Sequence, residues 1–332
     1  MGAGNLPLLF LTRRIPEPGP TLLRGSFTVC GGDEDRDLTG ADLLDGVRGA
    51  AAVLCTLRER IDAAVLDAAG SSLRVVSNYA VGYDNIDVAA ATERGILVTN
   101  TPGVLTDATA DLTWALILAA ARRVVEGDRM VRSGAFQGWA PTMLLGADVA
   151  GATLGIVGMG QIGRAVARRA AGFSMPVVYT RRSGPLKLEE TPAGVEWRYC
   201  SDLDDLLREA DIISVHVPLT EGTRHLLGAR ELALVRPGVV LVNTARGPVV
   251  HEEALVEALR AGPLGAAGLD VYEDEPAIHP GLVGLENVVL LPHLGSATHA
   301  ARGRMAELAA RNAIAALSGK RVPHPVNPEV LS

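Results

Sequence analysis

The chain has 332 residues, of which 48% are hydrophobic, and a formal net charge of −7. A chain of this length and composition can bury a large core and is expected to be a soluble protein of two domains. The acidic balance leaves no basic surplus to neutralise a phosphate backbone, which argues against nucleic acid as the primary partner.

Three cysteines, Cys30, Cys55 and Cys200, are scattered along the chain without metal-ligand spacing. An odd, scattered set is typical of buried thiols in a reducing compartment rather than of a disulfide framework. The longest apolar run, at 114–121, is far shorter than the roughly 20 residues of a membrane span, and the first residues resemble a strand more than a signal peptide. We therefore predict a cytoplasmic protein with no membrane partner and no metal.

From residue 6 to residue 101, short apolar runs alternate with segments of helical pattern such as LTGADLLDGVRG and RIDAAVLDAAG. This alternation predicts parallel strands with helices on both faces of the sheet, and so a first α/β domain. The runs expected to be strands are at 8–11, 27–30, 52–57, 73–77 and 96–98.

A Thr-Pro-Gly sequence at 101–103 interrupts this pattern, and a long apolar helix is expected to begin at Asp107 or Thr109. We interpret this helix as a crossing between domains. A second helix is expected at 125–133. The segment near 125–150 is interpreted as a dimerisation arm, and a long surface loop is the alternative.

A glycine-rich turn lies between two apolar runs, the first at 154–157 and the second at 177–179. Its sequence, Gly-Met-Gly-Gln-Ile-Gly, is followed by residues at helical spacing, which is typical of a dinucleotide-binding turn. Gly158 would permit the tight turn, Gly160 would let a diphosphate approach the helix N-terminus, and Gly163 would let helix and strand pack closely. A turn kept for packing alone is the alternative, and the flanking strands favour the nucleotide site.

After this turn the alternation resumes, and 153–291 is predicted to form a complete doubly wound nucleotide domain. A final helix at 298–317 has no further strand to support, so we expect it to return to the first domain and make that domain discontinuous. The later strands are expected at 196–199, 211–217, 239–243, 266–271 and 288–291.

The choice of cofactor depends on the end of the second strand of this domain, where an acid would select NAD. The chain has Thr180, Arg181, Arg182 and Ser183 there instead. Without an acid to repel a 2′-phosphate, and with guanidinium groups able to bind one, the site is predicted to prefer NADP(H), with NAD(H) possible. Two solvated arginines on a turn are the alternative.

Three motifs at predicted strand ends, together with two earlier segments, resemble those of the D-isomer-specific 2-hydroxyacid dehydrogenases over nearly the whole chain. The segments at 77–84 and 100–111 look most like the glyoxylate/hydroxypyruvate reductase branch of that family. The motifs are NTARG at 243–247, GLDVYEDEP at 268–276, PHLGSAT at 292–298, GMGQIG at 158–163 and VGYDNID at 81–87.

The resemblance implies two doubly wound α/β domains, with a Rossmann nucleotide domain inserted in a flavodoxin-like substrate domain. The nucleotide domain is expected at 101–292 and the substrate domain at 1–100 and 293–332. It also implies a homodimer and the reduction of a small 2-oxo acid, glyoxylate or hydroxypyruvate, to the D-2-hydroxy acid.

Carried over residue by residue, the catalytic residues of this family are Arg246, Glu275 and His293. The chemistry supports these roles, because reduction of a 2-oxo acid requires a cation for the carboxylate and carbonyl and a proton donor for the developing alkoxide. Arg246 would supply the first and His293 the second, while Glu275 would favour the protonated imidazole.

The resemblance also assigns binding residues. Substrate is expected at Leu57, Val81, Gly82 and Arg246, with backbone amides of Val81 and Gly82 holding its carboxylate. Asp270 matches the residue that holds the nicotinamide amide. The cofactor residues are expected to be Gly158, Met159, Gly160, Gln161, Ile162, Gly163, Thr180, Arg181, Arg182, Val217, Pro218, Thr223, Thr244, Ala245, Arg246, Asp270, His293 and Gly295.

Two other functions stay open at this point. The first is a dehydrogenase of another D-2-hydroxy acid, such as a larger one or a phosphorylated serine precursor. The second is a nucleotide-sensing binding protein, because the family includes transcriptional corepressors with the same catalytic set. The absence of a long tail and of a basic face favours the enzyme.

Overall fold

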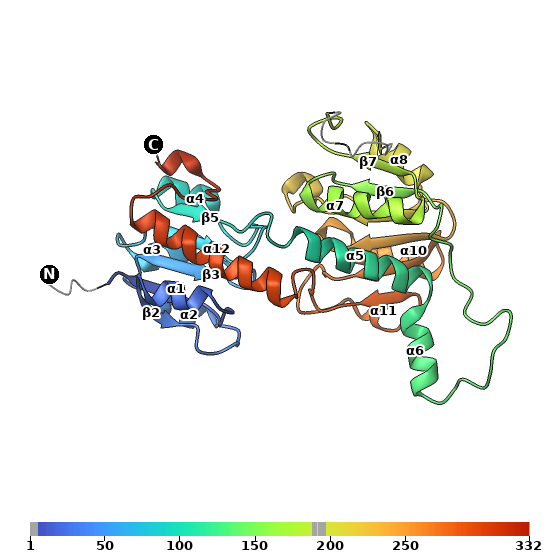
Figure 1. Ribbon diagram of the computed structural model, residues 1–332, viewed down its shortest axis with the longest axis horizontal. Coiled ribbons are helices and arrows are strands. Elements are labelled where there is room, and N and C mark those ends of the chain that lie inside the picture. Colours follow the sequence, from blue (N-terminus) through green and yellow to red (C-terminus); the bar gives the residue numbers. More distant parts are fainter. Residues whose placement is uncertain (1–5, 188–190, 192–196, 332) are drawn as a thin grey trace. The chain divides into compact units, whose positions relative to one another are not determined.

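The computed structural model describes residues 6–187, 191 and 197–331. The chain divides into two compact units (Figure 1). Unit 1 comprises Met1–Leu105 and Ser296–Ser332, and unit 2 comprises Thr106–Gly295. The division falls a few residues from the predicted boundaries and groups His293 with unit 2.

Unit 1 contains a five-stranded parallel sheet in the order β2-β1-β3-β4-β5. This is the flavodoxin-like order. Strand β2 is added on one side of β1, and β3, β4 and β5 are added in turn on the other side, so the switch point lies between β1 and β3. Its strands are β1 (Leu8–Leu11), β2 (Thr28–Gly31), β3 (Ala52–Cys55), β4 (Val75–Asn78) and β5 (Leu97–Thr99).

Helices cover both faces of this sheet, as the buried side chains show. One hydrophobic cluster joins the sheet to α2, α3 and α4, and the other joins it to α1 and α12. The helices are α1 (Gly19–Arg24), α2 (Gly40–Gly46), α3 (Ala63–Ala69), α4 (Val88–Glu93) and α12 (His299–Leu317).

Four of these helices begin at side-chain caps that the sequence carries. Thr39, Asp62, Asp87 and Thr298 each accept a hydrogen bond from a backbone N–H in the first helical turn. A cap of this kind stabilises a helix by about 1 kcal/mol. Short helices such as α2, α3 and α4 therefore depend on their caps and on packing against the sheet.

Unit 2 contains a seven-stranded parallel sheet in the order β12-β11-β10-β9-β6-β7-β8. The order reverses between β6 and β9, which is the topological switch point where ligands bind in such sheets. The strands are β6 (Leu154–Val157), β7 (Val177–Thr180), β8 (Trp197–Tyr199), β9 (Ile212–Val215), β10 (Val239–Asn243), β11 (Leu264–Leu269) and β12 (Val288–Leu290).

Both faces of this second sheet are covered as well. One cluster contains buried residues of α5 and α7, and the other contains buried residues of α8, α9 and α10. The helices are α5 (Thr106–Ala121), α6 (Val124–Arg132), α7 (Gln161–Ala170), α8 (Leu203–Glu209), α9 (Ala229–Leu232), α10 (Glu252–Arg260) and α11 (Pro280–Val283). Helix α6 and the long segment after it extend from unit 2 (Figure 1).

The predicted fold class, two parallel α/β domains, is confirmed. Local differences remain, because α1 begins within the sequence Pro-Gly-Pro, which is typical of a turn, and was not expected as a helix. The strand expected at 196–199 appears as β8, and its first residue lies outside the described residues.

Within the described part of the chain, no helix is long and apolar enough to cross a membrane.

Candidate functional site

The glycine turn connects the carboxyl end of β6 to the N-terminus of α7, at the switch point of the unit 2 sheet. Gly158 has φ of +101°, and a Cβ there would lie 2.8 Å from the backbone of His216. At Gly163 a Cβ would lie 2.3 Å from the carbonyl oxygen of Gly158. Both positions therefore require glycine for backbone reasons.

Gly160 differs from these two glycines because no atom lies within 4 Å of the position a Cβ would take. Among the described residues, the N–H groups of Gln161 and Ile162, in the first turn of α7, have no hydrogen-bond partner. Open space in front of unpaired N–H groups and the positive end of the helix dipole suits a diphosphate. The residues present therefore fit a dinucleotide, and the side chain of a larger residue at 160 would fill the space that it needs.

The edge of this turn is formed by the end of β7. The carbonyl oxygen of Thr180 accepts hydrogen bonds from the N–H groups of Gly158 and Met159, at 3.1 and 3.2 Å. The side chain of Arg181 donates from Nε to Oγ of Ser183 at 2.7 Å, and Arg182 is exposed. Arg181 and Arg182 are thus the first two residues after β7, the strand that borders the glycine turn.

The loop after β9 carries three further predicted cofactor residues. Oγ1 of Thr223 donates to the carbonyl oxygen of Pro218 at 2.6 Å, which closes the loop onto Val217 and Pro218. At the base of the loop, His216 is partly buried, and desolvation of its ring lowers its pKa to about 3. Its Nε2 lies 2.8 Å from Oγ of Ser214, so this histidine is neutral and structural.

His293 and Glu275 are brought together at the carboxyl edge of the same sheet. Nδ1 of His293 lies 2.9 Å from Oε2 of Glu275, whose other oxygen accepts the N–H of Tyr272 at 3.0 Å. Because an ionised carboxylate only accepts hydrogen bonds, Nδ1 carries the proton of this pair. Among the described residues Nε2 of His293 has no partner, so it is the nitrogen available to a substrate.

The electrostatic environment of Glu275 keeps it ionised. Burial would raise the pKa of this carboxyl group, but the hydrogen bond and charge of His293 act against burial. The N–H of Tyr272 and the charge of Arg246 add to this effect, and the pKa of Glu275 lies below its ordinary value. The pair therefore consists of an ionised carboxylate and an imidazole that is hydrogen-bonded to it.

Asp270 fixes the loop that carries His293. Its two carboxylate oxygens accept the N–H groups of Leu294 and Gly295, at 2.6 and 2.8 Å. His293 has φ of +56°, a left-handed conformation that costs a residue other than glycine roughly 1 to 2 kcal/mol. The two hydrogen bonds to Asp270 offset that cost. Burial raises the pKa of Asp270, and the two N–H groups and His293 only partly oppose this effect.

Arg246 follows β10 and is held in place through its backbone. Nδ2 of Asn243 donates to the carbonyl oxygen of Arg246 at 2.9 Å, and Oδ1 of Asn243 accepts the N–H of Ala245 at 3.0 Å. Thr244 is bonded to Thr113 of α5 through their hydroxyl groups, 2.9 Å apart. Sequence reasoning assigned no role to Asn243, although its place at the strand end, directly before the TARG sequence, was a usable signal.

Three of the four predicted substrate residues, Leu57, Val81 and Gly82, belong to unit 1. Leu57 follows β3 and the Val81-Gly82 sequence follows β4, so both lie at the carboxyl ends of neighbouring parallel strands. Within the described residues, the N–H groups of Val81 and Gly82 have no hydrogen-bond partner. They are therefore available to a carboxylate, while the predicted catalytic and cofactor residues belong to unit 2.

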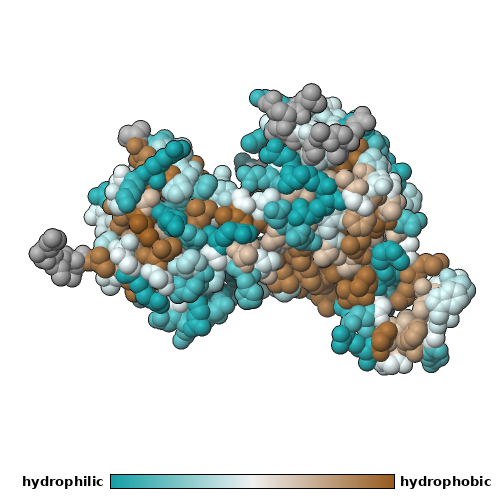
Figure 2. Space-filling view, viewed as in Figure 1, coloured by the Kyte–Doolittle hydropathy of each residue, from teal (hydrophilic) through white to brown (hydrophobic). Residues whose placement is uncertain are grey.

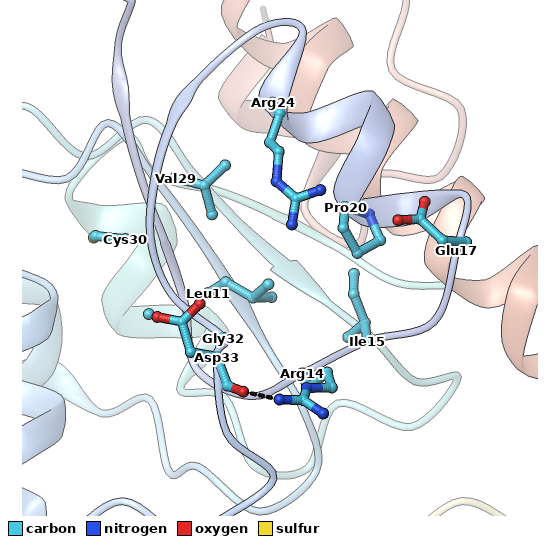
Figure 3. A pocket seen from close by; sticks show the side chains of 11 residues that line it. Leu11, Arg14, Ile15, Glu17, Pro20, Arg24, Val29, Cys30, Gly32 and Asp33 are labelled. Carbon is cyan, nitrogen blue, oxygen red and sulfur yellow. Dashed lines mark hydrogen bonds between the residues drawn. The ribbon is translucent and has the colours of Figure 1, made fainter.

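Other groups lie apart from these predicted residues. Nε2 of His225 is hydrogen-bonded to the carboxylate of Glu273, and no cluster of described His, Cys, Asp and Glu side chains is arranged to hold a metal. A cavity of about 540 Å³ in unit 1 lies between α1 and the ends of β1 and β2, with Arg24 and Arg14 on opposite sides of it (Figure 3). None of the predicted site residues lines this cavity.

The chain matches the family model described as D-isomer specific 2-hydroxyacid dehydrogenase, NAD binding domain, over residues 114–295. It is 50% identical to a glyoxylate reductase from Thermococcus onnurineus (strain NA1) over 330 residues, which cover 98% of this chain and 97% of that one.

Solved structures agree with this match. A protein from Thermus thermophilus superposes with a TM-score of 0.88 and 48% identity, covering 96% of this chain and 99% of that one. An NADPH-dependent glyoxylate/hydroxypyruvate reductase from Sinorhizobium meliloti, in complex with NADP and malonate, has a TM-score of 0.83 and 33% identity, covering 96% of each chain. The sequence of the present chain, its fold and the arrangement of its candidate site make it a member of the D-isomer-specific 2-hydroxyacid dehydrogenase family.

Proposed function

We propose that this protein reduces a small 2-oxo acid, glyoxylate or hydroxypyruvate, to the D-2-hydroxy acid with NADP(H). The observation that carries the proposal is the hydrogen bond of 2.9 Å between His293 and Glu275, which leaves Nε2 of the imidazole available. The pair lies at the carboxyl edge of a sheet whose glycine turn suits a dinucleotide. The relatives named glyoxylate reductase support the same substrate class.

The chain's own residues divide the chemistry among them. NADPH, held at the glycine turn, would supply a hydride for the carbonyl carbon. His293 donates the proton from Nε2 to the carbonyl oxygen, and Glu275 stabilises the imidazolium before the transfer. Arg246 binds the substrate carboxylate and polarises the carbonyl. In the reverse direction the neutral imidazole accepts the proton of the hydroxyl group.

The substrate carboxylate is held in this proposal by the unpaired N–H groups of Val81 and Gly82. Backbone amides suit this role because they bind an anion without adding a titrating group to the site. Leu57, half-buried after β3, would line the pocket and favour a small substrate.

NADP(H) is the proposed preference, because Arg181 and Arg182 follow β7 where an NAD-selecting acid would stand. The solved reductase from Sinorhizobium meliloti in complex with NADP supports it. Thr180, whose carbonyl holds the glycine turn, joins these arginines to the diphosphate site.

We also infer a homodimer formed through α6 and the segment after it. This segment exposes large hydrophobic side chains, with Trp139 80% and Leu145 66% accessible, and hydrophobic surface is visible on unit 2 beside it (Figure 2). A hollow of about 600 Å³ in unit 2 is lined by residues of α5, by Val125 and Leu145, and by residues next to β12. A second copy of the chain would cover this apolar surface, which a monomer would leave in water.

The three cysteines are free, which fits the reducing cytoplasm predicted from the sequence.

A panel of 2-oxo acids assayed at steady state with NADPH and with NADH tests the proposal. The expected result is a higher kcat/KM for glyoxylate or hydroxypyruvate than for larger 2-oxo acids, and a higher value with NADPH than with NADH. Binding of NADPH without turnover of any 2-oxo acid would instead favour a nucleotide-sensing protein.

A further inference from the structure

Three successive peptide groups after β4 are held by their carbonyl oxygens. The carbonyl of Ala80 accepts the N–H of Thr101 at 2.8 Å. The carbonyl of Val81 accepts Nδ2 of Asn100 at 2.7 Å, and that of Gly82 accepts Nδ2 of Asn78 at 2.7 Å. Each donor thus fixes one peptide plane in a segment that belongs to neither a helix nor a strand.

Holding the carbonyls decides where the N–H groups point. In a trans peptide the N–H and the C=O lie on opposite sides of the chain, so each N–H points away from the donor that holds its carbonyl. The three N–H groups concerned belong to Val81, Gly82 and Tyr83, and among the described residues none of them has a hydrogen-bond partner. We call these three groups the amide row.

The donors are themselves immobilised. Asn78 is the last residue of β4 and is fully buried, and its Oδ1 lies 3.6 Å from Sγ of Cys55. Asn100 is tied at its own backbone, because its carbonyl accepts Nδ2 of Asn312, a fully buried residue of α12, at 2.9 Å. Rigid donors of this kind reduce the entropy that the segment would otherwise lose when it binds an anion.

The same network reaches the turn that carries Leu57. Nδ2 of Asn78 lies 3.5 Å from Oδ1 of Asn85, and Nδ2 of Asn85 donates to the carbonyls of Thr56 and Glu59 at 2.9 and 3.0 Å. The buried carboxylate of Glu59 in turn accepts the N–H of Thr56 at 2.8 Å. The side chains of these asparagines therefore fix the backbone positions of both the amide row and the Leu57 turn, the two segments expected to contact the substrate.

We propose that Asn100 and Asn78 are positioning residues that preorganise the amide row for the substrate carboxylate, with Asn85 tying it to the Leu57 turn. The inference rests on the proposed function, in which Val81 and Gly82 bind that carboxylate. Neither asparagine touches the substrate. They act by holding carbonyl oxygens back so that three N–H groups face the ligand.

Asn100→Asp tests the proposal, because it keeps the size of the side chain and replaces the amide donor with an acceptor that repels the Val81 carbonyl. We expect KM for glyoxylate to rise tenfold or more, with kcat and KM for NADPH changed by less than threefold. This split is expected because the amide row contributes uniform binding of the carboxylate, in the ground state and the transition state alike.

Asn327→Asp is the matched control. Asn327 is almost fully buried in the same unit, donates to the carbonyl of Ile96 at 3.0 Å and lies beside β5, away from the amide row. The Asn327→Asp variant is expected to lower the thermal midpoint at least as much as Asn100→Asp does, while its KM for glyoxylate stays within twofold of that of the unmodified protein. Equal changes in KM for the two variants would overturn the proposal, since they would report a general loss of stability.

A second measurement separates this inference from the proposed function. Oxalate titrated into ¹⁵N-labelled protein should shift the amide resonances of Val81, Gly82 and Tyr83, and Asn100→Asp should weaken that binding tenfold or more. If the unmodified protein reduces no 2-oxo acid, the proposed function fails, and the oxalate shifts still decide the role of Asn100. Unperturbed amide resonances in the unmodified protein, or equal oxalate affinity in the variant, would overturn the inference.

Discussion

Glu275 and His293 interact through one hydrogen bond of 2.9 Å. Burial acts to raise the pKa of the Glu275 carboxyl group, but the hydrogen bond and the charge of His293 oppose it, and this pKa lies below its ordinary value. The stability that Glu275 contributes is present above its ordinary pKa of about 4.3 and is lost as pH falls through its lowered value. In assays near neutral pH the carboxylate of Glu275 therefore keeps its negative charge.

The first prediction follows from this pair. Glu275→Gln keeps the shape of the side chain and removes its charge. We therefore expect the imidazolium of His293 to lose its proton at a lower pH in this variant. In the proposed mechanism reduction requires the protonated imidazole and its rate falls as pH rises, so the descending limb of the reduction profile should move to lower pH. The measurement is kcat/KM for glyoxylate against pH at saturating NADPH. A limb that stays where it is in the unmodified enzyme would show that another group controls the proton.

The second prediction concerns the two arginines after β7. Replacing Arg181 and Arg182 together with alanine should raise KM for NADPH at least tenfold and KM for NADH less than threefold, because only NADPH carries the 2′-phosphate. Hydrogen bonds to charged groups contribute about 1.5 to 3 kcal/mol each, which is enough for this change. Arg168→Ala, in the last turn of α7, removes a guanidinium group farther from the glycine turn and is the control. Equal losses for both cofactors would contradict the prediction.

At the scale of a single element, the glycine turn before α7 separates two kinds of glycine. A Cβ at Gly163 would meet the carbonyl oxygen of Gly158 at 2.3 Å, whereas a Cβ at Gly160 would meet nothing within 4 Å. One glycine is therefore required by the fold itself, and the other only by a ligand.

The third prediction contrasts these two positions. Gly163→Ala should lower the thermal midpoint by several degrees and weaken cofactor binding, because helix and strand must move apart. Gly160→Ala should leave the thermal midpoint unchanged or higher and raise KM for NADPH and NADH alike by tenfold or more. Thermal unfolding and steady-state assays of the two variants decide the point. A normal KM in Gly160→Ala would show that no diphosphate occupies this space.

The elements also show what a sequence can and cannot predict. The turn at 158–163 was predictable because its glycines and flanking strands are contiguous, and Gly158 and Gly163 are each required by the local backbone. The role of Asn100 was not, because the hydrogen bond from Asn100 to Val81 depends on two strand ends that the fold brings together. Helix α1 was missed because its two prolines and its glycine indicate a turn, and only packing against α12 makes it helical.

At the scale of the whole molecule, the exposed arm sets the expected assembly. Val131, Phe136, Trp139 and Leu145 are all exposed, and a monomer would leave them in water. The residues of the candidate catalytic centre belong to strand ends of unit 2 rather than to this arm. Assembly and chemistry are therefore expected to be separable by substitution.

The fourth prediction tests that separation. Trp139→Asp combined with Leu145→Asp should convert the dimer into monomers, because burying two carboxylates in an apolar interface is strongly unfavourable. Light scattering at micromolar protein concentration measures the mass, and Leu6→Asp, at an exposed position outside the arm, is the control. A monomeric mass for the unmodified protein would refute the inferred dimer, and an unchanged dimer in the double variant would place the interface elsewhere.

Helix α12 has a consequence for how the protein matures on the ribosome. Its alanine face, Ala306, Ala309, Ala310 and Ala313, is fully buried against a sheet whose strands all lie before residue 100, and Ser77 donates to the carbonyl of Ala309 at 2.9 Å. The whole of Thr106–Gly295 is translated between these partners. At a translation rate of 5 to 20 residues per second, α12 is synthesised roughly 10 to 40 s after the last strand of that sheet. During this time the apolar face of the sheet lacks the helix that covers it. The inserted unit can complete its own core first, so the amino-terminal segment of unit 1, which ends at Leu105, is the part of the nascent chain that most needs a chaperone.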